Sequence, residues 1–418
     1  MPLPGVVAED TLPRPIPQGD AGRAWTFLAL LAAAELLGMS PWFTGSAASP
    51  YLALRWALSE SQVGGLSTAV QLGFVLGTAI AAVLNLADVI PARRYFAWAA
   101  FAAALSNAAL VWAPDYTTAL VTRALTGLCM AGVYPPAMKM AATWFRARRG
   151  LAVGAVVGAL TVGKATPYLW HVLPDAGLSV IVISASAACA LAGLAIGTFW
   201  QDGPFAFPSR HFSWGLVGEV IATPRYRLAT GGYLGHMAEL YAYWTWIPAF
   251  VAASAIAWAG DPLAAHASWV GVLSFGTIAV GGLGCLWGGV VSDRIGRERL
   301  VMIAMAVSGG CALAIGLLFG KSPWLLAPLA LAWGFFVIAD SAQFSVLVTE
   351  SVPAHAVGTA LTIQVCLGFL LTTITIQMIP PLVARFGWQA AFALLAVGPL
   401  LGIVAIRRLQ AQRPVTAA

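Results

Sequence analysis

The chain has 418 residues, of which 60% are hydrophobic and 9% are charged, and its formal net charge is +6. Soluble proteins average about 25% charged residues, so the composition excludes a soluble protein and indicates an integral membrane protein. The basic residues lie in short loops, where a membrane surface accounts for them, so no nucleic-acid partner is expected. The five cysteines lie in apolar segments with spacings unlike a metal site, and no metal or other cofactor is expected.

Residues 1–23 are rich in proline and charge, which predicts a disordered cytoplasmic tail and no cleavable signal peptide. Two groups of apolar segments follow, each segment near the ~20 residues that cross a bilayer as a helix. The first group covers 24–46, 62–86, 95–113, 117–142, 150–172 and 178–199, and the second covers 228–253, 268–291, 300–319, 324–349, 357–380 and 388–407. Helices are expected because an open strand would leave unpaired backbone groups in lipid.

A polar stretch separates the two groups and divides the chain. The expected domains are an N-terminal bundle at 24–199, a cytoplasmic linker at 200–227, a C-terminal bundle at 228–408 and a cytoplasmic tail at 409–418. Most basic residues fall in loops on the side of the N-terminus, while the opposite loops hold only Arg55, Lys321 and Arg385. The positive-inside rule therefore predicts a multi-pass protein of the inner (cytoplasmic) membrane with both termini in the cytoplasm.

A short charged loop follows the second apolar segment of each half. Asp88 and Asp293 mark the two copies, 205 residues apart, and the same offset aligns the first segments of the halves. Such repeats, related by an axis along the membrane normal, are typical of transporters. The second copy comprises Gly289, Asp293, Arg294, Gly296 and Arg297, and the first comprises Asp88, Arg93 and Arg94. Glycine permits a tight turn, and Asp can accept hydrogen bonds from a neighbouring helix N-terminus.

This repeated G-x-x-x-D-R-x-G-R pattern resembles the major facilitator superfamily, and the resemblance covers nearly the whole chain. It implies an all-α fold of twelve transmembrane helices in two pseudo-symmetric six-helix bundles. In that family the loop latches helices in one state of the alternating-access cycle, which implies the same role for both copies here. The second copy is expected to contribute more, because Val89, Pro91 and Ala92 replace the family's Arg, Gly and Arg in the first.

A narrower resemblance rests on the fourth and fifth apolar segments. The R-x-x-x-G sequence that begins at Arg123, the Trp144-Phe145 pair and the glycine-rich segment 150–172 are most similar to the nitrate/nitrite and cyanate porters. Nitrate porters carry Arg in the segments that correspond to 62–86 and 268–291, and both lack Arg here, so nitrate itself is not expected.

Ionisable residues lie well inside the apolar segments, at a cost of about 2.5–3.5 kcal/mol for Asp, Lys or Arg at a helix centre. Glu35 and Glu239 occupy matching positions in the two halves, and His236 lies one helical turn before Glu239. A buried carboxylate beside a histidine can exchange a proton near neutral pH. Glu239 with His236 is therefore expected to couple protons, with Glu35 or Asp340 in reserve. The alternative for each is a structural hydrogen bond.

Two further charges are candidates for the substrate cavity. Arg123 opens a motif that the family resemblance links to proton coupling, and its alternative is a structural role on the backbone carbonyls of a neighbouring helix. Arg123 and Lys164 together would draw an anion inward, or would neutralise Glu35. The remaining expected cavity residues are polar or aromatic: Gln71, Gln364, Tyr241 and Gln343.

The expected function is a proton-coupled secondary transporter, such as a symporter, that moves a small polar solute by alternating access, with an organic anion as one solute class. One alternative is a proton-driven exporter of drugs or toxic compounds, although Ala159 follows Gly158 where drug antiporters carry Gly-Pro. Another is a membrane sensor or scaffold that does not transport. An enzyme is not expected, because no nucleotide-binding loop or nucleophile pattern occurs. The expected partners are the solute, protons and the bilayer, with the chain as a monomer.

Overall fold

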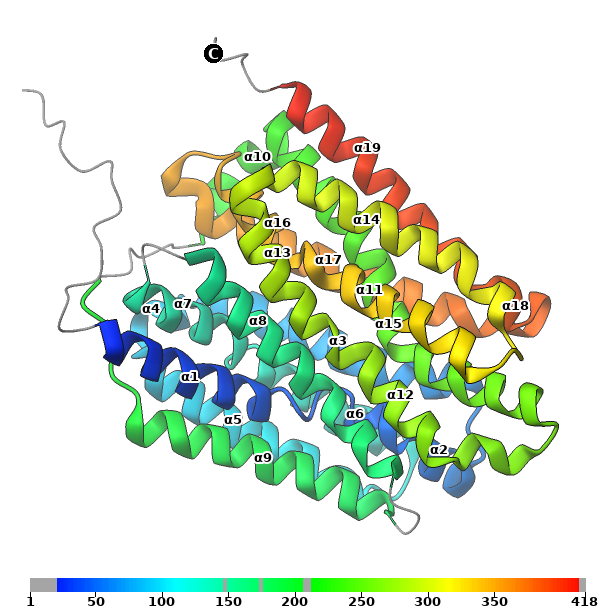
Figure 1. Cartoon of the computed structure of the whole chain (residues 1–418). Coiled ribbons are helices and arrows are strands. Elements are labelled where there is room, and N and C mark those ends of the chain that lie inside the picture. The colour runs from blue at the N-terminus through cyan, green and yellow to red at the C-terminus, as the bar shows by residue number, and fades with distance from the viewer. Residues whose placement is uncertain (1–20, 146–148, 173–175, 206–211, 413–418) are drawn as a thin grey trace, which may run out of the picture.

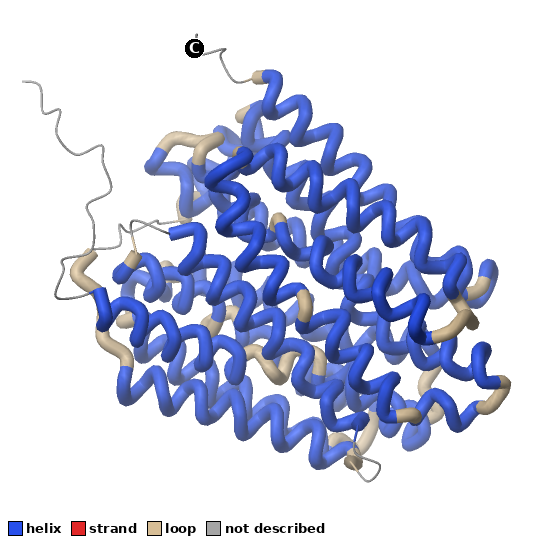
Figure 2. The backbone as a smooth tube through the Cα atoms, viewed as in Figure 1, coloured by secondary structure: helices blue, strands red, loops and turns tan. Residues whose placement is uncertain are grey.

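The computed structural model describes residues 21–145, 149–172, 176–205 and 212–412, and every regular element among them is a helix (Figures 1 and 2). Figure 1 shows two groups of roughly aligned helices, coloured blue to green and green to red, packed side by side. Ten helical segments in this part of the chain are long and apolar enough to cross a membrane. Two more crossings are each assembled from two shorter helices, which gives the expected twelve.

The N-terminal half contains α1 (Ala21–Gly38), α2 (Thr44–Trp56), α3 (Glu60–Val83), α4 (Leu86–Val89), α5 (Ala92–Ala108), η1 (Ala109–Trp112), α6 (Tyr116–Met130), α7 (Tyr134–Trp144), α8 (Arg149–Ala165), η2 (Thr166–Val172) and α9 (Leu178–Phe199). Between the halves lies α10 (Trp214–Ala222). The C-terminal half contains α11 (Pro224–Ala259), η3 (Pro262–His266), α12 (Ser268–Ala279), α13 (Gly281–Ile295), α14 (Arg297–Ala314), η4 (Ile315–Leu318), α15 (Pro323–Ala339), α16 (Ser341–Thr349), η5 (Ala354–Ala356), α17 (Val357–Phe386), α18 (Trp388–Ala391), η6 (Phe392–Ala396) and α19 (Val397–Ala411).

The first and fourth crossings are interrupted by turns that carry or precede proline. Residues 39–43, which include Pro41, separate α1 from α2, and residues 131–133 separate α6 from α7, whose first turn carries Pro135. Proline lacks a backbone donor and is best accommodated in the first turn of a helix, so it favours a break just before it. The fourth crossing, expected as one segment at 117–142, is therefore interrupted. The first crossing also continues to Trp56, well beyond the expected boundary at residue 46.

The ends of the two bundles differ from the expected boundaries. The long helix α11 begins at Pro224, inside the stretch expected to be linker, because proline at the first helical position suits a helix start. The helix α1 begins at Ala21, and α19 continues to Ala411. The start of α1 and the end of α19 lie at one end of the molecule, which we call the terminal end (Figure 1). The remaining tail residues, 1–20 and 413–418, lie outside the described part of the chain.

Glycine allows the helices to pack backbone against backbone. A Cβ on Gly73 of α3 would overlap with the Ala124 carbonyl oxygen of α6, and a Cβ on Gly127 of α6 would overlap with that of Val70. Lipid tails provide no hydrophobic drive for helix association, so close contacts between small residues supply much of the packing energy. The glycine of the R-x-x-x-G motif is thus a packing residue.

The outer surface is apolar, as a lipid-facing surface must be. Among the exposed side chains are large hydrophobic residues from most of the crossings, including Leu105, Leu283 and Ile374. Exposed tryptophans such as Trp112 and Trp324 lie at helix ends, where aromatic side chains anchor a protein at the membrane interface. The largest side chains between the helices, such as Trp244 and Trp333, are fully buried.

Candidate functional site

Arg123 is a structural residue at the break in the first crossing. One guanidinium nitrogen donates to the carbonyl oxygens of Pro41 and Trp42 at 2.8 and 2.6 Å, and the other donates to the Asn107 side chain at 2.6 Å. The break between α1 and α2 leaves backbone carbonyls unpaired, and Arg123 satisfies two of them. The geometry therefore supports the structural alternative for Arg123, in which it binds backbone carbonyls of a neighbouring helix. Its guanidinium faces these partners instead of a solute cavity.

Lys164 lies between the two halves inside a ring of aromatic side chains, the Lys164 cage, formed with Trp42, Tyr241 and Trp244. Its ammonium donates a hydrogen bond of 2.6 Å to the Tyr241 hydroxyl. It also lies 4.1, 4.9 and 5.2 Å from the ring centroids of Trp42, Tyr241 and Trp244. Such cation–π contacts stabilise a desolvated ammonium by about 2 kcal/mol. Lys164 and Trp42 come from the N-terminal half, and Tyr241 and Trp244 come from α11, so the cage joins the halves.

Glu35 is the acidic residue whose charge interacts with that of Lys164. Its side chain in α1 is fully buried, and Lys164 acts on it electrostatically. Among the described residues, neither of its carboxylate oxygens has a hydrogen-bond partner. A buried charged group without partners is costly, so Glu35 is a strong candidate for a group that is neutral in one step of a cycle.

Several other buried polar groups of this central region also lack partners within the described part of the chain. They are the indole nitrogens of Trp42 and Trp244 and the side-chain amide of Gln71 in α3. Gln71 lies one helical turn before Phe74, whose ring is 5.1 Å from that of Trp42. Buried polar groups are nearly always hydrogen-bonded, so a cluster of unpaired donors indicates a place where a ligand supplies the partners.

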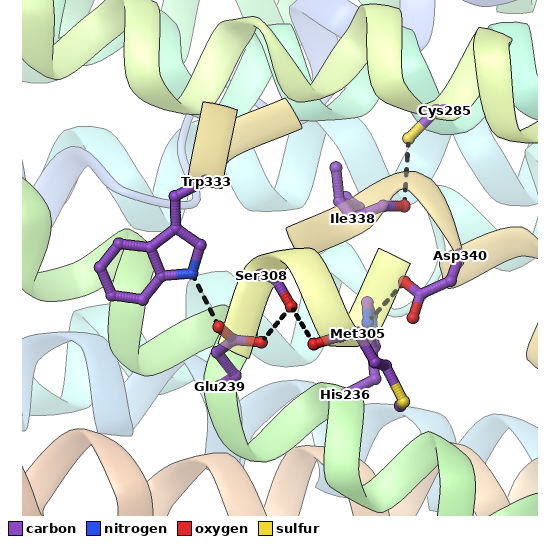
Figure 3. Close-up of polar contacts among 8 residues, drawn as sticks. All are labelled: His236, Glu239, Cys285, Met305, Ser308, Trp333, Ile338 and Asp340. Atoms are coloured by element: carbon purple, nitrogen blue, oxygen red, sulfur yellow. Dashed lines mark hydrogen bonds and ion pairs between the residues drawn. The ribbon is translucent and has the colours of Figure 1, made fainter. Parts of the chain in front are cut away.

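Glu239 lies among residues of the C-terminal half, away from the cage. Trp333 of α15 donates to one carboxylate oxygen at 2.7 Å, and Ser308 of α14 donates to the other at 2.8 Å (Figure 3). Among the described residues, Glu239 has no hydrogen bond with its expected neighbour His236. His236 instead pairs with Asp340, and its Nδ1 lies 2.9 Å from the Asp340 carboxylate (Figure 3).

The three acidic and basic groups nevertheless form one buried cluster of the C-terminal half. Asp340 acts electrostatically on Glu239, and Asp340 sits at the break between α15 and α16. The break frees backbone groups and brings polar side chains together. The Nε2 atom of His236 has no hydrogen-bond partner among the described residues. Gln343 follows in α16, and Gln364 of α17 donates to the neighbouring carbonyl of Phe344 at 3.5 Å, so two of the three expected cavity glutamines are buried beside this cluster.

The second charged loop lies against the other half at the terminal end. A Cβ on Gly289 of α13 would be 2.7 Å from the carbonyl oxygen of Gly150, at the N-terminus of α8. A Cβ on Gly150 would be 3.5 Å from the Asp293 carboxylate, so this carboxylate faces the positive end of the α8 dipole. Gly296 has a φ of +89°, which glycine adopts without strain. Arg297 pairs with Glu350 at 3.0 Å.

The first charged loop is less engaged in the described part of the chain. Arg93 donates to the Trp200 carbonyl oxygen at 3.4 Å, which is a weak bond within the N-terminal half. Arg94 and, in the second loop, Arg294 are exposed. The side chain of Asp88 lies outside the described residues. The second loop contacts the other half through Gly289 and Asp293.

A cavity of about 720 Å³ opens between the halves at the end opposite the termini, and we call it the outer cavity. Its walls come from α2 and η2 of one half and from α11, η3 and α12 of the other. The labels of α2 and α12 in Figure 1 lie at this end. The residues of the Lys164 cage do not line it.

Several residues of these sites were not anticipated from the sequence. Ser308 and Trp333 hold Glu239, and Trp42 and Trp244 surround Lys164. The chain has 17 tryptophans, and its sequence gives no signal for which of them meet a charge. Ser308 was discoverable as a polar residue inside the apolar segment 300–319.

Comparisons with known proteins agree with this architecture. A search of curated proteins by sequence gives no match. Among solved structures, a mutant of the nucleoside transporter NupG aligns with a TM-score of 0.69 at 14% identity, covering 92% of this chain and 99% of its own. A bacterial homologue of the human lysosomal transporter Spinster, inward-facing and unoccupied, aligns with a TM-score of 0.70 at 12% identity, covering 95% of this chain and 100% of its own. These likenesses show the fold.

The family model of the Major Facilitator Superfamily matches residues 30–376. This range runs from the first crossing into α17 and includes the Lys164 cage, the His236–Asp340 pair and both charged loops. With twelve helices in two pseudo-symmetric bundles and a family match over most of its length, the chain belongs to the Major Facilitator Superfamily of membrane transporters.

Proposed function

We propose that this transporter moves a small organic anion together with protons, and that the anion's charged group binds Lys164 between the two halves. The observation that carries the proposal is a buried ammonium whose one hydrogen-bond partner among the described residues is Tyr241. An ammonium has three N–H donors, so two remain for a ligand.

The surrounding chemistry favours an anion over a cation. The unpaired indole N–H groups of Trp42 and Trp244 and the amide of Gln71 add donors to those of Lys164. A carboxylate accepts up to four hydrogen bonds and would satisfy such a set. A fixed ammonium repels a lipophilic cation, which disfavours the alternative of cationic drug export. The aromatic walls suit an organic molecule, and Arg123 is engaged elsewhere, so the paired arginines of a nitrate site have no counterpart here.

Glu35 gives a physical reason for proton coupling. An anion bound to Lys164 would neutralise the ammonium charge that otherwise stabilises the Glu35 carboxylate. Two negative groups around one ammonium are unfavourable, and protonation of Glu35 removes the repulsion. Anion binding and proton binding would therefore assist each other, as symport requires. The Glu239 cluster with His236 and Asp340 is proposed as the proton site of the C-terminal half.

The position of Lys164 also links binding to movement. Lys164 belongs to α8, and Tyr241 and Trp244 belong to α11, so the cage is a contact between bundles that move relative to each other in alternating access. An anion that binds the ammonium competes with the Tyr241 hydrogen bond. The anion changes the free-energy difference between the two conformations by the difference between its binding free energies for them.

The test uses purified protein and a panel of small mono- and dicarboxylates. At least one member should raise the thermal unfolding temperature of the wild type through binding to the native state. Lys164→Gln should weaken this anion's affinity at least tenfold, because a charge-assisted hydrogen bond contributes about 1.5–3 kcal/mol. The control is Arg385→Gln, which removes an exposed cation at the far end of α17. The proposal fails if no anion stabilises the wild type, or if Lys164→Gln responds as the control does.

A further inference from the structure

The outer cavity has the size and walls of a ligand site of its own. Its volume of about 720 Å³ lies within the range of small-molecule pockets, which is about 300–1,000 Å³. Both halves contribute to its walls, and Leu54 at its rim is exposed. A ligand held there would touch both bundles and would stabilise this arrangement of them over any other.

Two hydroxyl groups that line the cavity lack partners. Tyr168 of η2 is 3% exposed and Thr245 of α11 is 6% exposed, so both are more than nine-tenths buried. Within the described residues, neither hydroxyl oxygen has a hydrogen-bond partner. One comes from each half. Native structures rarely leave such groups unpaired, which points to an occupant that hydrogen-bonds on both sides of the cavity.

Aromatic rings form one wall of the cavity. The imidazole of His171 lies between the rings of Tyr51 and Tyr168, with centroid distances of 6.4 and 6.3 Å and planes inclined by 33° and 29°. The Nε2 atom of His171 lies 2.8 Å from the Ala47 carbonyl oxygen. A ring nitrogen facing a carbonyl carries the hydrogen, so Nδ1 is the atom left for a ligand. His266 adds a second imidazole to the lining.

The ring of Phe43 lies near aromatic residues of both the cavity lining and the Lys164 cage. The ring of Phe43 lies 6.5 Å from that of Tyr168 on the cavity side, and 6.4 and 6.0 Å from those of Tyr241 and Trp244 in the Lys164 cage. The two sites are therefore neighbours without a shared lining residue. A ligand can therefore occupy one site without contacting the lining residues of the other.

We propose that the outer cavity is a second ligand-binding site, distinct from the Lys164 cage, for a planar aromatic molecule with hydrogen-bonding substituents. The aromatic ring would stack on the wall formed by Tyr51, His171 and Tyr168, where offset stacking contributes beyond simple burial. The polar groups of the ligand would pair with the hydroxyls of Tyr168 and Thr245. Because its ligand bridges both bundles, an occupied site slows the transport cycle.

The test compares benzoate with cyclohexanecarboxylate, which has the same carboxylate on a ring that is neither flat nor aromatic. Titration calorimetry on the purified full chain should show benzoate binding at least fivefold more tightly. The double variant Tyr168→Phe with Thr245→Val should weaken benzoate about tenfold, as expected for two lost hydrogen bonds. The control Thr230→Val removes another buried, unpaired hydroxyl of α11 that does not line the cavity, and it should leave benzoate binding unchanged.

A third variant separates this site from the Lys164 cage. Benzoate is itself an organic anion, so Lys164→Gln should remove any component of binding at the cage and retain the component that depends on Tyr168 and Thr245. The inference is overturned if Lys164→Gln abolishes all benzoate binding, if the double variant binds like the wild type, or if benzoate shows no advantage over cyclohexanecarboxylate. None of these outcomes depends on which solute the protein transports.

Discussion

At the scale of single residues, the membrane-buried charges divide into satisfied and unsatisfied groups. Arg123 has three hydrogen bonds to fixed partners, and Glu239 has two. Glu35 has none among the described residues, and Lys164 has one. A charge held by several fixed partners stabilises one structure, whereas a charge with few or no partners is free to meet a solute or a proton. This contrast leads to two predictions about proton coupling.

Glu35→Gln should change how anion binding depends on pH. In the wild type, the anion of the carboxylate panel should bind more tightly as pH falls, because protonation of Glu35 removes a negative charge beside it. The Gln variant is always neutral there, so it should bind at every pH about as tightly as the wild type does at low pH. Affinities measured between pH 5 and 8 check this. An unchanged pH profile in the variant would show that Glu35 does not sense the anion.

Glu239→Gln should abolish accumulation driven by a pH gradient and spare exchange of solute without a gradient. The amide keeps the shape of the carboxylate and cannot release a proton. It also accepts from only one of Ser308 and Trp333 with its single oxygen, so a stability loss of about 1 kcal/mol is expected as well. Proteoliposomes with and without an imposed gradient separate the two activities, and Ser308→Ala controls for the lost hydrogen bond. Accumulation by the Gln variant would move the coupling role to Asp340.

At the scale of helices, glycine on α8 serves two different contacts. Gly163 packs against α1 within the N-terminal half, where a Cβ would overlap with the Leu36 carbonyl oxygen. Gly158 faces α13 of the other half, and a Cβ there would lie 2.8 Å from the Gly282 carbonyl oxygen. The first contact belongs to the fold of one bundle. The second belongs to the interface that changes during the transport cycle.

Alanine at these two positions should therefore have different effects. Gly163→Ala should destabilise the protein by about 1–3 kcal/mol, as expected for overpacking, and lower its thermal unfolding temperature. Gly158→Ala should affect stability less and bias the protein away from the conformation in which α8 and α13 touch. Distances between fluorophores on the two halves would report this bias in detergent or nanodiscs. Equal losses of stability with no conformational bias would refute the distinction.

At the scale of the whole molecule, the two halves touch through glycine along α8 and α13, and the charged loop of Asp293 closes this seam at the terminal end. The outer cavity lies at the opposite end. In this conformation a solute therefore finds space at the end without the termini. If both termini are cytoplasmic, as the distribution of basic residues predicts, that end faces outward.

Asp293→Asn should weaken the closed seam and slow transport with little effect on folding. The carboxylate faces the N-terminus of α8, where a negative charge is stabilised by about 0.3–1 kcal/mol, so the variant shifts the equilibrium between conformations by that amount. Transport rates in reconstituted vesicles and the fluorophore distances across α8 and α13 measure the effect. Glu219→Gln, which neutralises an exposed carboxylate of α10 outside this loop, is the matched control. Transport rates equal to those of the control would reduce this loop to a charged turn.

The sequence by itself determined the architecture. Twelve apolar stretches of bilayer-spanning length, with an internal offset of 205 residues, allow one kind of fold, because lipid forbids unpaired backbone and each stretch must be helical. It also identified which charges are buried, since a charge inside an apolar segment is turned away from lipid toward the interior of the bundle. The sequence predicted the helix boundaries less accurately. The first crossing is broken at Pro41 and continues to Trp56, beyond the expected end at residue 46.

Only the tertiary structure decided the partners of those charges. His236 and Glu239 share a helical face, yet the break at Asp340 brings a different carboxylate to the histidine, while Ser308 and Trp333 reach Glu239 from helices far along the chain. Lys164 meets aromatic rings from both halves for the same reason. Periodicity places a side chain on one face of its own helix, whereas the contact it makes depends on how the helices pack, and close packing at glycine sets that arrangement.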